Sequence, residues 1–161
     1  MDRPRVLVLM GSSSDQELMR SCWEQLRELG IDFEVRIASA HRTPELVAEL
    51  AGKAREDGFG VIVAGAGWAA HLAGAVAAHT TLPVIAVPLA TSALGGFDAL
   101  LASVQMPSGV PVATVAVNGA RNAAWLAAEI LAVYDEELAE TLRQKRAEQA
   151  ERVKAAQVEL D

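Results

Sequence analysis

No Asp, Glu, Lys or Arg occurs between Asp57 and Asp98, and this long uncharged stretch must be buried in some apolar environment. A membrane-spanning helix is one explanation, but Pro83, Pro88 and several glycines interrupt the stretch, and a lipid-exposed helix tolerates such breakers poorly. Two strands buried in the middle of a sheet, with a helix between them, explain the missing charge better. We therefore expect a sheet whose central strands are covered on both faces.

The chain as a whole alternates strand patterns with helical patterns. Short apolar runs predict strands over residues 5–10, 33–38, 61–64, 84–87 and 112–117. Helical spacing predicts helices over about 18–29, 44–57, 69–78, 97–105, 121–134 and 136–158. Repeated β-α units predict a three-layer α/β/α fold with a flavodoxin-like five-stranded parallel sheet, order 2-1-3-4-5, and an extended C-terminal helix. Because no linker or repeat divides the chain, residues 1–161 are predicted to form a single domain.

Charge and composition restrict the partners. The net charge of −7, the 4% of aromatic residues and the lack of a basic stripe argue against long nucleic acid and anionic membranes. A phosphorylated small molecule is still allowed, since one Arg and a few backbone N–H groups suffice to bind it. Cys22 is the only cysteine, so we expect a buried thiol and a reducing, cytoplasmic location. Residues 1–4 are polar and charged, and we expect no signal peptide.

Ligands of such sheets bind beyond the carboxyl ends of the strands, which directs attention to the loops there. The first loop, Gly11–Asp15, offers Ser hydroxyls and free helix N–H groups to an anion, although its last two residues could instead be plain helix caps. The second loop, Ser39–Pro44, places His41 next to Arg42. Histidine exchanges protons near neutrality, and arginine can hold a phosphate by two hydrogen bonds. The second loop therefore predicts acid/base chemistry on a phosphorylated ligand.

The third and fourth loops add backbone and small polar groups. Residues 64–71 have almost no side-chain bulk before Trp68, so their backbone can approach a ligand and offer N–H groups to a carboxylate. His71 either faces the site or hydrogen-bonds a neighbouring loop. The fourth loop is expected to form a lid or a subunit contact, and its candidate residues are Ser92, Gly95 and Asp98, the last of which could equally cap a helix. No Cys/His cluster has metal-ligand spacing, and we expect neither a metal nor a cofactor.

Five short motifs follow one another in the chain: GSSSD at 11–15, SAHRTP at 39–44, AGAGWAAHLAG at 64–74, SALGGFD at 92–98 and VQMP at 104–107. With these motifs, nearly the whole chain resembles the N5-carboxyaminoimidazole ribonucleotide mutases of bacterial purine biosynthesis. The resemblance implies a cofactor-free isomerase that moves a carboxylate from the exocyclic nitrogen to C4 of aminoimidazole ribonucleotide, by decarboxylation and recapture of CO₂. It also implies a homo-octamer in which the amphipathic helix of residues 136–158 packs on neighbouring subunits.

The resemblance also implies roles for individual residues. It assigns the proton transfer to His41, phosphate binding to Arg42 and the serines, and the ribose hydroxyls to Asp15. Together with the loop argument, the predicted substrate-binding residues are Ser12, Asp15, Ser39, Arg42, Ala66, Gly67, Trp68 and His71.

Two positions depart from the pattern of these mutases. Ala73 stands where the pattern has Pro, which only loosens the start of a helix, and Trp68 stands where it has Gly. The indole would add bulk to the carboxylate and CO₂ pocket or fill it, or else point outward into a subunit contact. Two rival hypotheses follow from it. One is a paralogue that carboxylates or decarboxylates a different substrate with the same machinery, and the other is a non-catalytic nucleotide-binding module.

Overall fold

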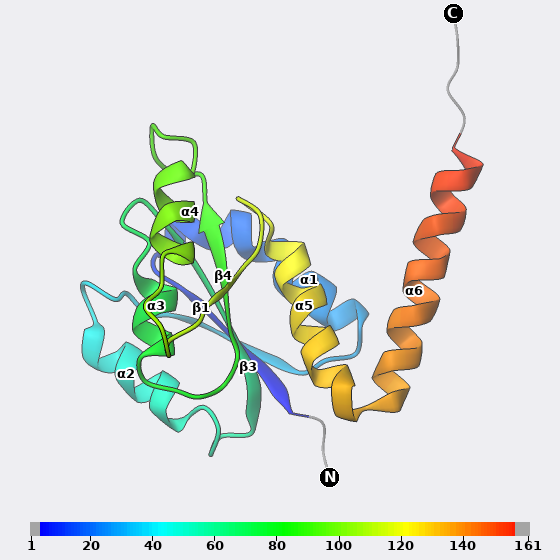
Figure 1. Ribbon diagram of the computed structural model, residues 1–161, viewed down its shortest axis with the longest axis horizontal. Helices are drawn as coiled ribbons and strands as arrows, with labels where there is room; N and C mark the ends of the chain where they lie inside the picture. Colours follow the sequence, from blue (N-terminus) through cyan, green and yellow to red (C-terminus); the bar gives the residue numbers. More distant parts are fainter. Residues whose placement is uncertain (1–3, 157–161) are drawn as a thin grey trace, which may run out of the picture.

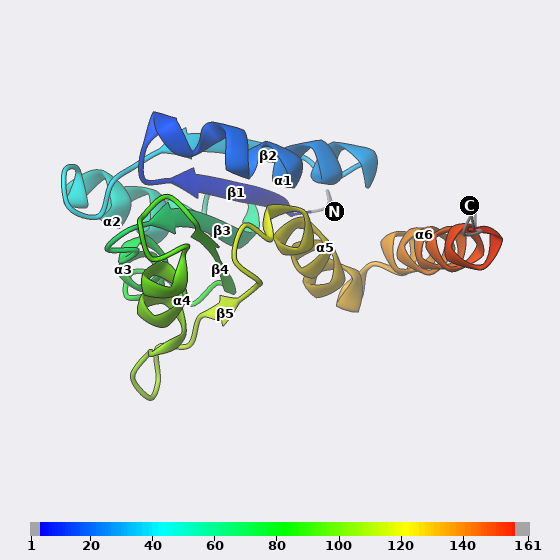
Figure 2. The same cartoon turned by 90° about the horizontal axis from the view of Figure 1, so that it is seen from above.

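A five-stranded parallel sheet with helices on both faces forms the body of the computed structural model, which describes residues 4–156 (Figures 1 and 2). The strands are β1 (Arg5–Met10), β2 (Phe33–Ile37), β3 (Phe59–Gly67), β4 (Val84–Leu89) and β5 (Ala113–Thr114). Their order in space is β2-β1-β3-β4-β5, which confirms the predicted topology. The chain reverses its direction of travel across the sheet between β1 and β3, and this is the switch point at which such sheets bind ligands.

The helices divide between the two faces as right-handed crossovers require. One face carries α1 (Gln16–Glu28) and α5 (Ala120–Leu131), and the other carries α2 (Pro44–Lys53), α3 (Leu72–Ala77) and α4 (Phe97–Val104), as Figure 2 shows. Two short 3₁₀ turns, Ser13–Asp15 and Ala132–Tyr134, precede α1 and follow α5.

Side chains of the central strands alternate between two apolar layers. In β1, Val6 and Val8 pack toward α1 and α5, while Leu7 and Leu9 pack toward α2 and α3. The same alternation in β3 and β4 leaves no position for a charged side chain, which accounts for the uncharged stretch. None of the helices within residues 4–156 is both long and apolar enough to cross a bilayer.

Four strands differ from their predicted bounds: β2 ends one residue early, at Ile37, β4 ends two residues late, at Leu89, and β3 and β5 differ the most. β3 continues through Gly67, because β4 pairs with it as far as Leu89, so half of the predicted third loop is strand. β5 is only two residues long instead of the predicted 112–117. The carbonyls of Ala86 and Pro88 face β5, accepting from Val115 N and Asn118 N, but Pro88 has no N–H to return, so the ladder cannot continue there.

Several helices are also shorter than predicted. α2 ends at Lys53 instead of about Asp57, and the residues after it form turns that lead into β3. α3 begins at Leu72 instead of about Ala69, so residues 69–71 belong to the loop and His71 takes the N-cap position. α5 gives way to the 3₁₀ turn after Leu131.

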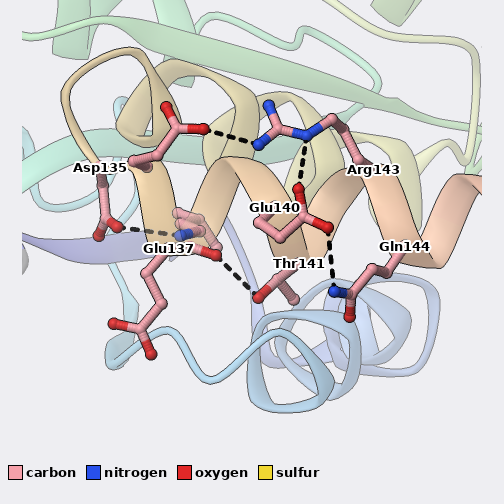
Figure 3. Close-up of polar contacts among 8 residues, drawn as sticks. Asp135, Glu137, Glu140, Thr141, Arg143 and Gln144 are labelled. Atoms are coloured by element: carbon pink, nitrogen blue, oxygen red, sulfur yellow. Dashed lines mark hydrogen bonds and ion pairs between the residues drawn. The ribbon is translucent and has the colours of Figure 1, made fainter.

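The last helix, α6 (Glu136–Ala155), leads away from the body of the fold (Figure 1). It begins where the Asp135 carboxylate accepts a hydrogen bond from Leu138 N at 2.9 Å, and Arg143 bridges Glu136 and Glu140 in its first turns (Figure 3). The first half of α6 is anchored to the fold, because Leu138 and Leu142 are its buried residues and Arg146 forms an ion pair with Glu129 of α5. The helix was predicted to run to Val158. The last two residues of that prediction, 157 and 158, lie outside the described part of the chain.

Candidate functional site

A cavity of about 440 Å³ opens at the carboxyl ends of β1, β2 and β3, where the topology predicts a ligand. Four loops contribute to its wall, and the lining residues are Gly11, Ser12, Ser14, Asp15, Ser39, Ala40, His41, Arg42, Ala66, Gly67, Trp68, Ala69, Leu72 and Thr91. Most of the residues predicted for the site are therefore brought together here, from segments far apart in the sequence.

The first loop supplies hydroxyls and a buried carboxylate. Ser12 Oγ accepts hydrogen bonds from Ser14 N at 3.3 Å and from Ser14 Oγ at 2.9 Å, which holds the two serines on one side of the cavity. Asp15 is only 6% exposed, and this burial raises the pKa of its carboxyl, against the opposing effects of hydrogen bonds from Ser12 and Ser14 and of the Arg42 charge. The end of the cavity beside the first loop is thus rich in polar groups that a phosphorylated sugar can use.

Arg42 ties the second loop to the first. Its Nη2 donates to the carbonyl of Gly11 at 3.0 Å, and its backbone N donates to Ser39 Oγ at 3.2 Å. Thr43 secures the same loop, since its hydroxyl accepts from Ser39 N at 2.9 Å and donates to Ser39 O at 3.2 Å. The loop that carries His41 is thereby closed on itself, with the guanidinium held at the cavity wall.

His41 lies beside a second histidine, His71, at the start of α3. Its Nε2 is 2.9 Å from Nδ1 of His71, and the two rings meet edge to face with centroids 4.9 Å apart. When both rings are neutral, one nitrogen of this contact must donate and the other accept, so the contact couples the tautomers of the pair. Of the two predicted positions for His71, the structure has the hydrogen bond to the neighbouring loop, and His71 is not among the lining residues.

The end of β3 forms a close-fitting wall. Gly67 lies so near Thr91 that a side chain at this position would overlap the Thr91 hydroxyl, which explains the need for glycine. Trp68 follows with its backbone in the left-handed region, at φ 51°, and its side chain is 65% exposed at the edge of the cavity. The indole therefore neither fills the cavity nor is buried, and the hypothesis of a pocket closed by Trp68 does not hold.

The fourth loop contributes less to the cavity than expected. Ser92, Gly95 and Asp98 do not line it, whereas Thr91, absent from the prediction, does. Asp98 lies in the first turn of α4 without capping it. Ser14, which the prediction for the first loop included as an anion-binding serine or a helix cap, also lines the cavity. Thr91 was missed because a hydroxyl residue in a polar loop carries no signal beyond its position after the end of a strand.

Other chemistry finds little support among the described residues. Cys22 is buried under the sheet, and burial raises the pKa of its thiol to about 12, so it is no nucleophile. Within residues 4–156, no three His, Cys, Asp or Glu side chains converge as metal ligands would.

The chain is similar to known proteins in both sequence and structure. Residues 5–152 match the family described as AIR carboxylase. The N5-carboxyaminoimidazole ribonucleotide mutase of Saccharolobus solfataricus is 54% identical over 140 residues, covering 87% of this chain and 89% of that protein. The enzyme of the same name from Bacillus subtilis is 53% identical over 146 residues, with 89% and 90% covered. The crystal structure of Treponema denticola PurE superposes with a TM-score of 0.86 and 34% identity, covering 94% of each chain.

Proposed function

The chain belongs to the AIR carboxylase family, and from this membership and the contents of the cavity we infer that it is an N5-carboxyaminoimidazole ribonucleotide mutase. It converts N5-carboxyaminoimidazole ribonucleotide to the 4-carboxy isomer in purine biosynthesis. The observation that carries the inference is the position of His41, which lies in one cavity with Arg42 and the serines of the first loop.

The polar end of the cavity suits the ribose phosphate. We propose that Arg42 and Ser12 hold the phosphate, because a guanidinium and a hydroxyl at a helix start both favour an anion. Asp15, acceptor-only when ionised, takes the ribose hydroxyls. Ser39 orients Arg42 through its 3.2 Å bond to the backbone of Arg42. With the phosphate placed there, the heterocycle extends toward His41 and the end of β3.

At the heterocycle, the reaction needs one proton to move and no external electrons. The bond between N5 and the carboxylate carbon breaks, CO₂ leaves, and the electron pair stays on the nitrogen, which takes a proton. C4 then attacks CO₂, and the proton on C4 is removed. We propose that His41 is the catalytic residue that carries this proton between C4 and N5, as an imidazole can do near neutrality. We propose that the small residues Ala66 and Gly67 let the carboxylate approach the end of β3 closely.

Assembly into a homo-octamer is the second part of the proposal. α6 extends beyond the body of the fold, and its distal Val153 is 76% exposed. A groove between α5 and α6, lined among others by Trp125, Leu126 and Val153, offers apolar area for a second copy. α4 also exposes Phe97, Leu101 and Val104 on one face. Such apolar surfaces support the burial of area between subunits.

The free thiol of Cys22, which is buried, fits the proposed cytoplasmic location.

The decisive experiment is direct. Purified protein should interconvert the two carboxylated ribonucleotides in buffer containing a chelator and no ATP. His41→Asn should reduce kcat by at least about 100-fold, the range of general acid/base catalysis, while calorimetry shows nucleotide binding retained. Absence of turnover with folded wild-type protein would refute the mutase function, and turnover by His41→Asn at the wild-type rate would remove His41 from the mechanism.

A further inference from the structure

Trp68 adopts a backbone conformation that costs free energy. Among residues 4–156, the non-glycine residues with positive φ are Trp68, at 51°, and Asn118, at 57°. Asparagine enters the left-handed region routinely, but a bulky aromatic residue does so only against steric repulsion between its Cβ and the backbone. Glycine would adopt the same conformation without that repulsion. A strained residue at the edge of a reactive cavity points to a role for its side chain.

The indole is the largest apolar group on the cavity wall. Its neighbours in sequence that also line the cavity are Ala66, Gly67 and Ala69, none of which can cover a ligand. Apart from the His41 imidazole, no other aromatic ring lines the cavity. Because the Trp68 side chain is 65% exposed, it is free to lie against a bound molecule without breaking existing packing.

The distribution of polar groups determines which part of the substrate meets the indole. Ser12, Asp15 and Arg42 occupy the end suited to the ribose phosphate, so the heterocycle falls beside His41 and Trp68. An aminoimidazole ring presents a flat π face, on which an indole stacks well. The CO₂ released from N5 is small and uncharged, and few directional contacts can hold it. A side chain that covers the cavity can retain the CO₂ by blocking its escape.

We propose that Trp68 is a specificity-determining residue that stacks on the aminoimidazole ring and retains CO₂ until C4 captures it. This role rests on the mutase function proposed above. The indole takes no part in proton transfer. It lowers the escape of CO₂ between cleavage of the N5 bond and formation of the C4 bond, and it raises affinity through the stacked face.

The test compares Trp68→Gly and Trp68→Phe with the wild type, starting from the N5-carboxylated substrate in ¹³C-bicarbonate. It measures released aminoimidazole ribonucleotide and ¹³C in the 4-carboxy product, after subtraction of an enzyme-free control. Trp68→Gly should raise KM by about 10-fold and markedly increase both CO₂ loss and label uptake, because both stacking and cover are removed. Trp68→Phe should keep both CO₂ loss and label uptake close to the wild-type values.

Thermal melting separates this role from a structural one. Glycine suits the left-handed backbone, so Trp68→Gly should show no loss of melting temperature, whereas a packing role predicts a loss. Fluorescence gives a second measurement. In a Trp23→Phe, Trp125→Phe background, where Trp68 is the sole indole, 4-carboxyaminoimidazole ribonucleotide should quench the emission, and Trp68→Phe with Trp23 and Trp125 intact is the matched control.

The outcomes distinguish this inference from the function on which it rests. If the wild type fails to turn over, the mutase function fails first. If the wild type turns over and Trp68→Gly shows unchanged KM, CO₂ loss and label uptake, only the role of Trp68 is overturned. The role of Trp68 would also be overturned if Trp68→Gly changed the oligomeric mass but left CO₂ loss and label uptake unchanged. The indole would then belong to a subunit contact.

Discussion

Nε2 of His41 and Nδ1 of His71 are 2.9 Å apart, although thirty residues separate them in the sequence. The contact joins the loop after β2 to the start of α3. It restricts the rotation of His41, and it makes one ring the donor and the other the acceptor when both are neutral. His71 does not line the cavity, so we regard it as a positioning residue for His41.

His71→Asn should lower kcat by about 5-fold or more, the equivalent of one lost hydrogen bond, and leave KM nearly unchanged. The reason is that His41 keeps its place in the loop but loses the partner that orients its ring. His79, exposed beyond the end of α3, offers a matched control, and His79→Asn should behave as wild type. A rise in KM with constant kcat would instead show that His71 contacts the substrate.

Arg42→Lys should raise KM by about 10-fold while kcat changes little. Lysine keeps the positive charge but loses the planar fork, which donates to the Gly11 carbonyl and which we propose also binds the phosphate. Steady-state kinetics measure the effect. Arg36→Lys on β2, where the side chain pairs with Glu34 at the surface, controls for the substitution itself. Equal KM values for Arg42→Lys and wild type would reduce the role of Arg42 to charge alone.

Asp15→Asn should raise the melting temperature at pH 7 and weaken substrate binding. Burial raises the pKa of Asp15 above its ordinary 3.8, so the ionised form is disfavoured in the folded state. The penalty is absent below pH 3.8 and complete above the raised folded pKa, and an amide avoids it. The difference in melting temperature between variant and wild type should therefore shrink as the pH falls toward 3.8. A variant less stable than wild type at pH 7 would contradict this.

Replacing Phe97 and Leu101 together by Asp should dissociate the proposed octamer, as measured by light scattering during size-exclusion chromatography. The two side chains are 61% and 42% exposed on α4, and a charge at each would be desolvated in a subunit interface. Val133→Asp offers a control, because Val133 is a still more exposed apolar residue that lies after α5 and outside this face. An unchanged mass would place the interface elsewhere.

Strand order and central burial were predictable because they depend on local patterns. Continuous apolar runs such as residues 5–10 mark strands covered on both faces, and the intervening helical spacing leaves few topologies. The ends of β3 and β5 were not predictable, whereas β1 has its predicted bounds. Gly65 and Gly67 have no preference for strand, yet β4 pairs with both, and β5 stops because of Pro88, a residue on another strand.

The membership of the site was predictable to a similar degree. Parallel topology brings the loops of Ser12, His41 and Arg42 to one edge of the sheet, whatever the conformation of each loop. These residues could therefore be predicted as members of the site. The contact between His41 and His71 depends on α3 beginning at Leu72, which the Ala-rich pattern of residues 69–78 does not reveal. Thr91 was missed because its position on the wall follows from its fit against Gly67, a long-range relationship.

The missing N–H of Pro88 also bears on how the molecule behaves in a crowded solution. An open sheet edge is a template on which another chain can add a strand, and this is a common first step in aggregation. If the two-residue β5 detaches, the exposed edge of β4 still lacks a donor at Pro88. At the opposite edge, β2 carries the charged pair Glu34 and Arg36. Both borders of the sheet are thus poor templates, which favours recovery over aggregation after partial unfolding.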